Sequence, residues 1–363
     1  MKRFCLVILV LAAAFSVSAQ MTPTAQNPLK VVLLLNGSLG DKSFFDSASN
    51  GIKMLQKTYG NTVSTKVIEM GYDQSKWEPA LIDISDGNWD VIVLGTWQMT
   101  EALQRVAKDH PNKKYIIFDT AVDYKLGLQN VYSMTYKENE SSFLAGALAT
   151  MVVGSNMPLA NKNKLIGFLG GMDIPVINDF LVGYIEGAHY IDKGMKIAIS
   201  YIGSFDDSAK GKEMALAQYR QGACIGYNVA GQAGLGQLDA AKDMNRYAIG
   251  VDSDQAAIFM TSDPAKAKLI TTSVLKRVDN SIVRAIQMTI KGTLPYGKAE
   301  SLGFAEQCVG LAKNDIYMSV VPKAMRDKLD QIEKDIMSGK IKVDSAFGMS
   351  TQDLDTLRNS VKP

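Results

Sequence analysis

The fold is constrained most by a regular alternation of short apolar runs with segments of helical periodicity, which begins at residue 30. Residues 30–35 are mostly aliphatic, and an apolar side chain then recurs at helical spacing at Phe44, Ala48, Ile52 and Leu55. Further apolar runs, separated by helical patterns, follow at residues 65–70, 90–94 and 114–118. Strands that are apolar on both faces need helices on both sides, so the pattern predicts a parallel sheet covered on each face.

The same pattern starts again near residue 139. An apolar helical segment precedes a second series of strand-like runs, at residues 165–169, 196–202, 224–230, 247–251 and 269–274. Two successive halves of similar size predict an α/β protein with two Rossmann-like lobes, each built on a parallel sheet. Ligands of open parallel sheets bind outside the carboxyl ends of the strands. We therefore expect the segments that follow the strands of both lobes to face one shared cleft.

The first nineteen residues have the composition of a secretory signal peptide. Lys2 and Arg3 precede an apolar run at 4–15, and Val17 and Ala19 fit the −3 and −1 positions of a cleavage site. The run is shorter than the roughly 20 residues that a membrane-spanning helix needs. We expect cleavage after Ala19, the alternative being an uncleaved anchor. The cysteine of this segment precedes the cleavage site, so the sequence offers no lipobox.

Charge and side-chain composition argue against two classes of partner. The chain has 39 basic and 37 acidic residues, and signal cleavage removes two basic ones, which leaves the mature chain formally neutral. Proteins that neutralise many phosphates carry a basic excess, so no nucleic-acid partner is expected. Cys224 and Cys308 either pair or stay free, and a buried thiol is favoured for Cys224. The cysteines and the two histidines lack metal-ligand spacing, so we expect no metal and no cofactor.

The first candidate binding segment is the turn at 40–46, directly after the first predicted strand. Asp41 either caps the next helix or faces the ligand. Phe44 and Phe45 are adjacent and cannot both face the core of an amphipathic helix. One of them is therefore expected to stack on a planar ligand, an interaction worth about 1–3 kcal/mol for a nucleic-acid base.

Further candidates follow strands of the second half. Gly231 lies in a glycine-rich turn that lacks dinucleotide or P-loop spacing, which favours close approach to an uncharged ligand or a tight turn alone. Asp252 and Asp254 allow one carboxylate to cap the next helix while the other, which we expect to be Asp252, accepts hydrogen bonds from vicinal hydroxyls. Lys276 either donates to a sugar oxygen, pairs with Asp252 or is a solvated surface lysine.

Four more positions complete the predicted site. Asp119 ends a strand, where it either meets the polar edge of a base or caps the next segment. Trp97 follows another strand and either lines the cleft or covers the edge of a lobe. Met172 and Phe205 lie in segments that follow strands of the second half, and they are expected on the opposite side of the cleft.

The ordered set of motifs resembles the basic membrane protein (BMP), or PnrA-like, family of ABC-transporter substrate-binding proteins. The matching stretches are residues 41–44, 137–146, 167–175, 201–207, 229–236, 248–255 and 272–279. The resemblance implies a type I periplasmic-binding fold, α/β, in which three chain crossings form a hinge between the lobes. It also implies a nucleoside ligand, often a purine nucleoside, and an ABC-transporter permease as partner.

The resemblance implies roles for individual residues. Phe44 matches the aromatic that stacks on the base, and Phe205 matches a second aromatic wall more weakly. Asp252 and Lys276 match the residues that hold the ribose, and Asp119 matches an acidic residue near the base.

Two departures from the family pattern bear on the ligand and on location. Many members have asparagine where this chain has Phe45, which replaces a polar contact with an apolar surface. Many members are lipoproteins, whereas the missing lipobox predicts a protein that is free in the periplasm.

The resemblance also suggests how the chain divides. Lobe 1 is predicted to contain residues 29–134 and about 266–296, and lobe 2 residues 135–265 and about 297–363. The ligand-contacting residues would then include Phe44, Asp119 and Lys276 on lobe 1, and Phe205, Gly231 and Asp252 on lobe 2. We expect a monomeric binding protein that is not an enzyme. The alternatives are a receptor for a sugar or nucleobase, a sensory receptor, and an exported nucleoside hydrolase, for which the chain offers no catalytic constellation.

Overall fold

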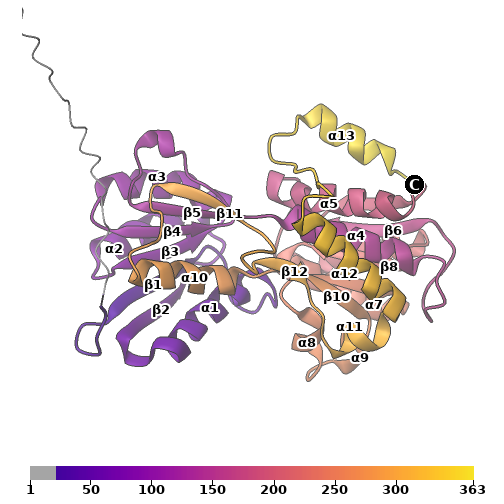
Figure 1. Ribbon diagram of the computed structural model, residues 1–363, viewed down its shortest axis with the longest axis horizontal. Coiled ribbons are helices and arrows are strands. Elements are labelled where there is room, and N and C mark those ends of the chain that lie inside the picture. Colours follow the sequence, from indigo (N-terminus) through magenta and orange to yellow (C-terminus); the bar gives the residue numbers. More distant parts are fainter. Residues whose placement is uncertain (1–21) are drawn as a thin grey trace, which may run out of the picture.

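The computed structural model describes residues 22–363, so the predicted signal peptide, residues 1–19, lies outside the described residues. The described chain forms two α/β lobes (Figure 1). The N-terminal segments form most of the lobe on the left of the view, and the C-terminal helices lie on the other lobe.

A six-stranded sheet forms the centre of each lobe. In spatial order the first sheet contains β11 (Lys298–Leu302), β5 (Val131–Tyr136), β4 (Lys114–Phe118), β3 (Val91–Gly95), β1 (Leu29–Leu35) and β2 (Val63–Glu69). The second sheet contains β12 (Val309–Leu311), β10 (Ile270–Lys276), β9 (Tyr247–Asp252), β8 (Ile225–Val229), β6 (Leu165–Gly170) and β7 (Lys196–Tyr201). All neighbouring strands are parallel except β12, which pairs antiparallel with β10. The predicted α/β fold with two Rossmann-like lobes is confirmed.

Helices cover the sheets. The first lobe carries α1 (Phe44–Tyr59), α2 (Trp77–Asp86), α3 (Thr100–Asp109) and α10 (Val278–Ile290). The second lobe carries α4 (Glu138–Val152), α5 (Pro175–Ile191), α6 (Ser208–Arg220), α7 (Leu235–Met244), α8 (Gln255–Phe259), α9 (Pro264–Ala267), α11 (Asp315–Val320), α12 (Lys323–Met337) and α13 (Thr351–Ser360). Among residues 22–363, no helix is long and apolar enough to cross a membrane.

The central strand β1 shows why both faces are covered. Its side chains alternate between the two faces of the sheet. Leu33 belongs to a buried cluster that also contains Ile52 of α1 and Ile282 of α10. Leu34, the next residue, belongs to a different cluster with Leu81 of α2 and side chains of α3. A strand that is apolar at every position except Lys30 is therefore stabilised by two separate helix layers, as the sequence pattern predicts.

The chain passes between the lobes three times, after β5, β10 and β11. The predicted lobe boundaries are wrong at the last two passages. Strand β10, which was assigned to lobe 1 with residues 266–296, pairs with β9 in the second sheet. Strand β11, which was assigned to lobe 2 with residues 297–363, pairs with β5 in the first sheet. The positions of these two passages depend on which strands pair across the sheets. Such pairing joins segments far apart in the sequence, so no local pattern of apolar residues reveals it.

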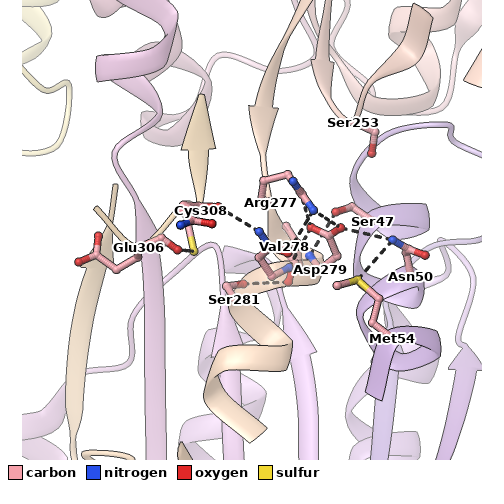
Figure 2. A network of polar contacts seen from close by, with 12 residues as sticks. Ser47, Asn50, Met54, Ser253, Arg277, Val278, Asp279, Ser281, Glu306 and Cys308 are labelled. Carbon is pink, nitrogen blue, oxygen red and sulfur yellow. Dashed lines mark hydrogen bonds and ion pairs between the residues drawn. The ribbon is translucent and has the colours of Figure 1, made fainter. Parts of the chain in front are cut away.

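Polar contacts join the second and third passages to α1 (Figure 2). The backbone N–H of Arg277 donates to the carbonyl of Cys308 at 2.8 Å. The Arg277 guanidinium donates twice to the carboxylate of Asp279, at 2.9 and 3.0 Å, and Asn50 of α1 donates to the same carboxylate at 3.3 Å. Within the described residues Cys308 and Cys224 are both buried and free, so they do not pair. The hinge is thus held by backbone and charged hydrogen bonds rather than by a disulfide.

Glycines allow α4 and α5 to approach each other closely. A Cβ at Gly187 would lie 1.9 Å from the carbonyl oxygen of Phe143. We expect Gly187→Ala to lower the free energy of unfolding by about 3 kcal/mol, because the two backbones must move apart. Urea unfolding followed by circular dichroism measures the loss. Gly310→Ala is the control, since no described atom other than those of Gly310 and its two chain neighbours lies within 4 Å of its Cβ position. Equal stability of the two variants would contradict the prediction.

Candidate ligand-binding site

A cavity of about 330 Å³ lies between the lobes and receives residues from the carboxyl ends of strands in both sheets. The residues predicted from the sequence to contact a ligand all line this cavity: Asp41, Phe44, Phe45, Trp97, Asp119, Met172, Phe205, Gly231, Asp252 and Lys276. The structure therefore brings together side chains from distant parts of the sequence, as expected for strand-end segments of two facing sheets. Their contacts with a ligand stay a prediction.

Three strand ends at the cavity hold a backbone conformation that side-chain-bearing residues rarely adopt. The φ angle is +72° at Thr96 after β3, +67° at Asp119 after β4, and +62° at Asp252, the last residue of β9. Such a left-handed conformation costs on the order of 1–3 kcal/mol for each residue and persists only where the surroundings enforce it. Clustering of this strain around one cavity is typical of a functional site.

Lys276 lies at the centre of the charged part of the cavity. It ends β10 of the second sheet, so the expectation that it sits on lobe 1 beside Phe44 is wrong. Its side chain reaches across to lobe 1, where Nζ donates to Oδ1 of Asp119 at 2.6 Å. It is 3 % exposed, so it is not a solvated surface lysine.

Burial and neighbouring charges set the protonation of this group. Burial lowers the pKa of Lys276, but Asp119, Glu138 and Asp252 outweigh it and raise the pKa above its usual range. Burial raises the pKa of Asp252 to about 6, although Lys276 and a hydrogen bond from Ser43 act in the opposite direction. At neutral pH the cavity therefore contains a permanent ammonium and an ionised Asp252 carboxylate.

Two aspartates near the cavity act as helix caps. Asp41 accepts hydrogen bonds from the backbone N–H groups of Ser43, Phe45 and Asp46, at 3.0, 2.7 and 3.0 Å. Its carboxylate thus accepts hydrogen bonds from the free backbone N–H groups at the N-terminus of α1. The side chain still borders the cavity. Asp254 accepts from the N–H of Ala257 at the start of α8 at 3.0 Å. This leaves the neighbouring Asp252 without a capping role, as the sequence predicts.

Aromatic side chains enter the cavity from both lobes. On lobe 1 the ring of Phe44 packs 5.4 Å from that of Phe45 and 5.5 Å from that of Phe118. Phe205 enters from lobe 2 and packs on Gly171, where a Cβ would lie 2.4 Å from the ring. Trp97 is 49 % exposed although it lines the cavity, which places it at the cavity's solvent side. The cavity thus combines aromatic surfaces from both lobes with a buried charged group.

The comparison with protein families agrees with this architecture. A family model described as ABC transporter substrate-binding protein PnrA-like matches residues 29–345, most of the chain. The chain belongs to this family. The resemblance inferred from the sequence motifs is confirmed, and the protein is a PnrA-like substrate-binding protein of the ABC-transporter type.

Individual relatives also match this chain over most of its length. Basic membrane protein A of Borreliella burgdorferi is 30% identical over 352 residues, which cover 95% of this chain and 96% of that protein. The ABC transporter nucleoside-binding protein BmpA of Lactococcus lactis is 30% identical over 259 residues, 69% of each chain. A solute-binding protein structure from Aeropyrum pernix K1 superimposes with a TM-score of 0.77 at 26% identity, covering 92% of this chain and 98% of that one.

Other residues also line the cavity of this PnrA-like protein without having been predicted as ligand contacts, and three of them are Asn36, Phe180 and Tyr72. Asn36 follows β1 and donates to Thr96 Oγ1 at 2.7 Å, while no group among residues 22–363 donates to its buried Oδ1. Its position after a strand was the available signal. Phe180 and Tyr72 also line the cavity. Phe180 is in α5, where its spacing is that of a core residue, and Tyr72 is in a loop. Neither position therefore indicated from the sequence that the residue lines a cavity.

Direct contacts join the lobes around the cavity. Ser43 Oγ of lobe 1 donates to Asp252 Oδ2 of lobe 2 at 2.5 Å, and Ser253 Oγ donates to the carbonyl of Ser43 at 2.9 Å. The Tyr72 hydroxyl also donates to Gln232 Oε1 at 3.3 Å. Because hinge opening separates the lobes, these bonds stabilise the conformation in which the cavity is lined from both sides.

We expect Tyr72→Phe to speed ligand release about two- to fivefold, because it removes one partly exposed hydrogen bond that holds the lobes together. Stopped-flow measurement of tryptophan fluorescence after displacement of bound ligand gives the dissociation rate. Tyr190→Phe is the matched control, since Tyr190 is similarly exposed and does not line the cavity. A release rate for Tyr72→Phe equal to that of the control would show that the bond does not hold the lobes.

Proposed function

We propose that the protein binds a nucleoside, with purine nucleosides as first candidates, in the interlobe cavity and delivers it to an ABC-transporter permease. The observation that carries the proposal is that the cavity is lined by two kinds of side chain, aromatic and charged. Aromatic rings of Phe44, Phe45 and Phe205 offer faces for a planar base, and Asp252 with Lys276 offers an acceptor and a donor for ribose hydroxyls. The cavity volume of about 330 Å³ is in the range of small-ligand pockets.

Family membership supports the proposal. The Lactococcus lactis relative is named as nucleoside-binding, and its identity to this chain is 30%. Ligand that touches both lobes stabilises the closed conformation by its differential affinity for that state, which is the signal that a permease reads.

Isothermal titration of the chain without residues 1–19 tests the ligand class. The panel contains inosine, guanosine, adenosine, cytidine and uridine, with free ribose and hypoxanthine as controls. We expect at least one purine nucleoside to bind more tightly than either of its separate halves, because base and sugar contact different walls of one cavity. A sugar or peptide that binds while every nucleoside fails would refute the nucleoside proposal.

Further properties belong to the same proposal. The protein is exported, is cleaved after Ala19 and remains free in the periplasm as a monomer. It binds its ligand without changing it chemically. Intact mass of the protein recovered from periplasm tests the cleavage site, and light scattering during gel filtration tests the monomer. Chromatography of inosine after long incubation tests for release of the free base, which we expect to be absent.

A further inference from the structure

Glu138 is a buried carboxyl group that the proposed contacts with ligand do not use. It is the first residue of α4, directly after the first passage between the lobes, and it is 1 % exposed. It does not line the cavity, and no group among residues 22–363 donates a hydrogen bond to its Oε2. Burying a carboxyl group is costly unless a partner compensates it. The nearest cation is Lys276, whose Nζ lies 3.7 Å from Glu138 Oε1.

The ammonium of Lys276 has few other restraints. One hydrogen bond joins it to Asp119 at 2.6 Å. Around it are the rings of Phe44, Tyr136 and Phe180, with centroids 5.7, 5.6 and 4.8 Å from Nζ, which exclude water but accept no directed hydrogen bond of ordinary strength. A long, flexible lysine stem therefore depends on its carboxyl neighbours to fix where its charge lies.

The two carboxyl neighbours belong to different lobes. Asp119 follows β4 of lobe 1, so its contact with Lys276 crosses the cleft and is lost when the lobes separate. Glu138 begins α4 of lobe 2 and Lys276 ends β10 of the same lobe. Their contact therefore persists in the open protein, in which ligand enters.

We propose that Glu138 is a positioning residue for Lys276: it holds the ammonium in place on lobe 2, so that ligand and Asp119 meet a prearranged donor when the lobes close. Prearrangement raises affinity because the side chain is already ordered before ligand binds. The entropy cost of ordering it then no longer weakens binding. This inference deepens the proposed function and rests on it for the affinity measurement.

The environment of Glu138 indicates how it holds the ammonium. Burial raises the pKa of Glu138 well above its usual range; Asp179 and Asp119 act in the same direction and Lys276 opposes them. A protonated carboxyl still offers its carbonyl oxygen to an N–H donor. At 3.7 Å the Glu138 oxygen and the ammonium are too far apart for a hydrogen bond, so the oxygen attracts the ammonium through its partial or full negative charge, and the oxygen of an amide should supply much of that attraction.

Two neutral variants of similar size separate positioning from space filling. Glu138→Gln keeps an oxygen acceptor near Lys276, and Glu138→Met fills the same volume without one. In titrations with inosine we expect Glu138→Gln to bind within about threefold of the parent protein and Glu138→Met to bind at least about tenfold more weakly. The urea midpoint of Glu138→Met should be equal or higher, because an apolar side chain suits a buried position. Equal affinities of the two variants would overturn the proposal.

Crystal structures of the ligand-free variants give a second reading that does not depend on the ligand. We expect the Lys276 ammonium to remain beside the side chain of residue 138 in Glu138→Gln and to leave that position in Glu138→Met. An ammonium that stays in place in both variants overturns the positioning role. Failure of the parent protein to bind any nucleoside, combined with a displaced ammonium only in Glu138→Met, overturns the proposed function and leaves the positioning role supported.

Discussion

Replacing Lys276 by methionine should weaken nucleoside binding at least about 30-fold and destabilise the protein at neutral pH. The affinity falls because the substitution removes a buried, hydrogen-bonded charge from the cavity, a change that typically costs about 2–5 kcal/mol of binding free energy. Stability falls by about 3–5 kcal/mol because the carboxyl groups of Asp119 and Asp252 lose the cation that compensates their burial. Isothermal titration and urea unfolding measure the two losses.

The stability loss of Lys276→Met should depend on pH in a defined direction. Burial already raises the pKa of Asp119, Glu138 and Asp252, and Lys276 opposes this increase at each of them. Without the lysine, the folded protein holds protons on these groups to higher pH than the unfolded chain does. Protons bound preferentially by the folded state stabilise it as pH falls. The stability that Lys276→Met loses relative to the parent protein should therefore be small near pH 5 and large near pH 8.

Lys323→Met is the control for this prediction. Lys323 also forms an ion pair, with Asp327 at 2.7 Å, but its side chain is 77% exposed. Exposed pairs contribute little to stability, so we expect the control to leave both affinity and unfolding almost unchanged. A deficit of Lys276→Met that stays constant from pH 5 to pH 8 would show that the carboxyl groups do not depend on the lysine for their charge.

The sequence predicts the architecture well because the deciding features are local. A strand such as β1, apolar at successive positions, fits only a sheet covered on both faces. Helix-forming periodicity between such strands leaves few alternatives to a parallel α/β arrangement. Asp119, Asp252 and Lys276 could be placed in one cleft because the carboxyl ends of parallel strands meet at one edge.

Features that depend on non-local pairing were not predictable in the same way. Strand β11 is an edge strand with the sequence Lys-Ala-Glu-Ser-Leu, which has no apolar run, and its position is set by backbone bonds to β5. The same applies to Glu138 and Phe180, which lie in helices whose periodicity indicates only burial. Their relation to Lys276 exists only after the second lobe folds and brings the two helices close to the end of β10. Long-range geometry, rather than residue type, gives these positions their role.

Asp252→Asn should lower the affinity for a ribonucleoside about 10- to 100-fold at pH 7.5, because a charged acceptor of buried hydroxyl hydrogen bonds is worth about 1.5–3 kcal/mol. The pKa of Asp252 is about 6 in the folded protein, above its ordinary value of 3.8. If the ligand prefers the ionised carboxylate, the affinity of the parent protein falls as pH drops below 6, whereas that of Asp252→Asn stays level. Titration calorimetry between pH 5 and 8 measures both profiles.

Folding stability should respond to Asp252→Asn in the opposite sense. A raised pKa means that the folded state disfavours the ionised form, so Asp252 contributes stability at low pH and loses it as pH rises through about 6. Removing the charge should therefore leave stability at pH 7.5 unchanged or higher, and the amide oxygen can still accept the hydrogen bond from Ser43. Lower affinity with undiminished stability would identify the carboxylate as a ligand contact rather than a structural group.

Two comparisons complete the design of this test. Asp254→Asn changes a carboxylate two residues away that caps α8, where asparagine is an equally good cap, so its affinity and pH profile should match the parent protein. 2′,3′-Dideoxyinosine, which lacks the two vicinal hydroxyls, should bind the parent protein more weakly than inosine does, but it should lose very little affinity for Asp252→Asn, because the partner of those hydroxyls is already weakened. Additive losses from the two changes would place the ribose elsewhere in the cavity and leave Asp252 with a purely electrostatic role beside Lys276.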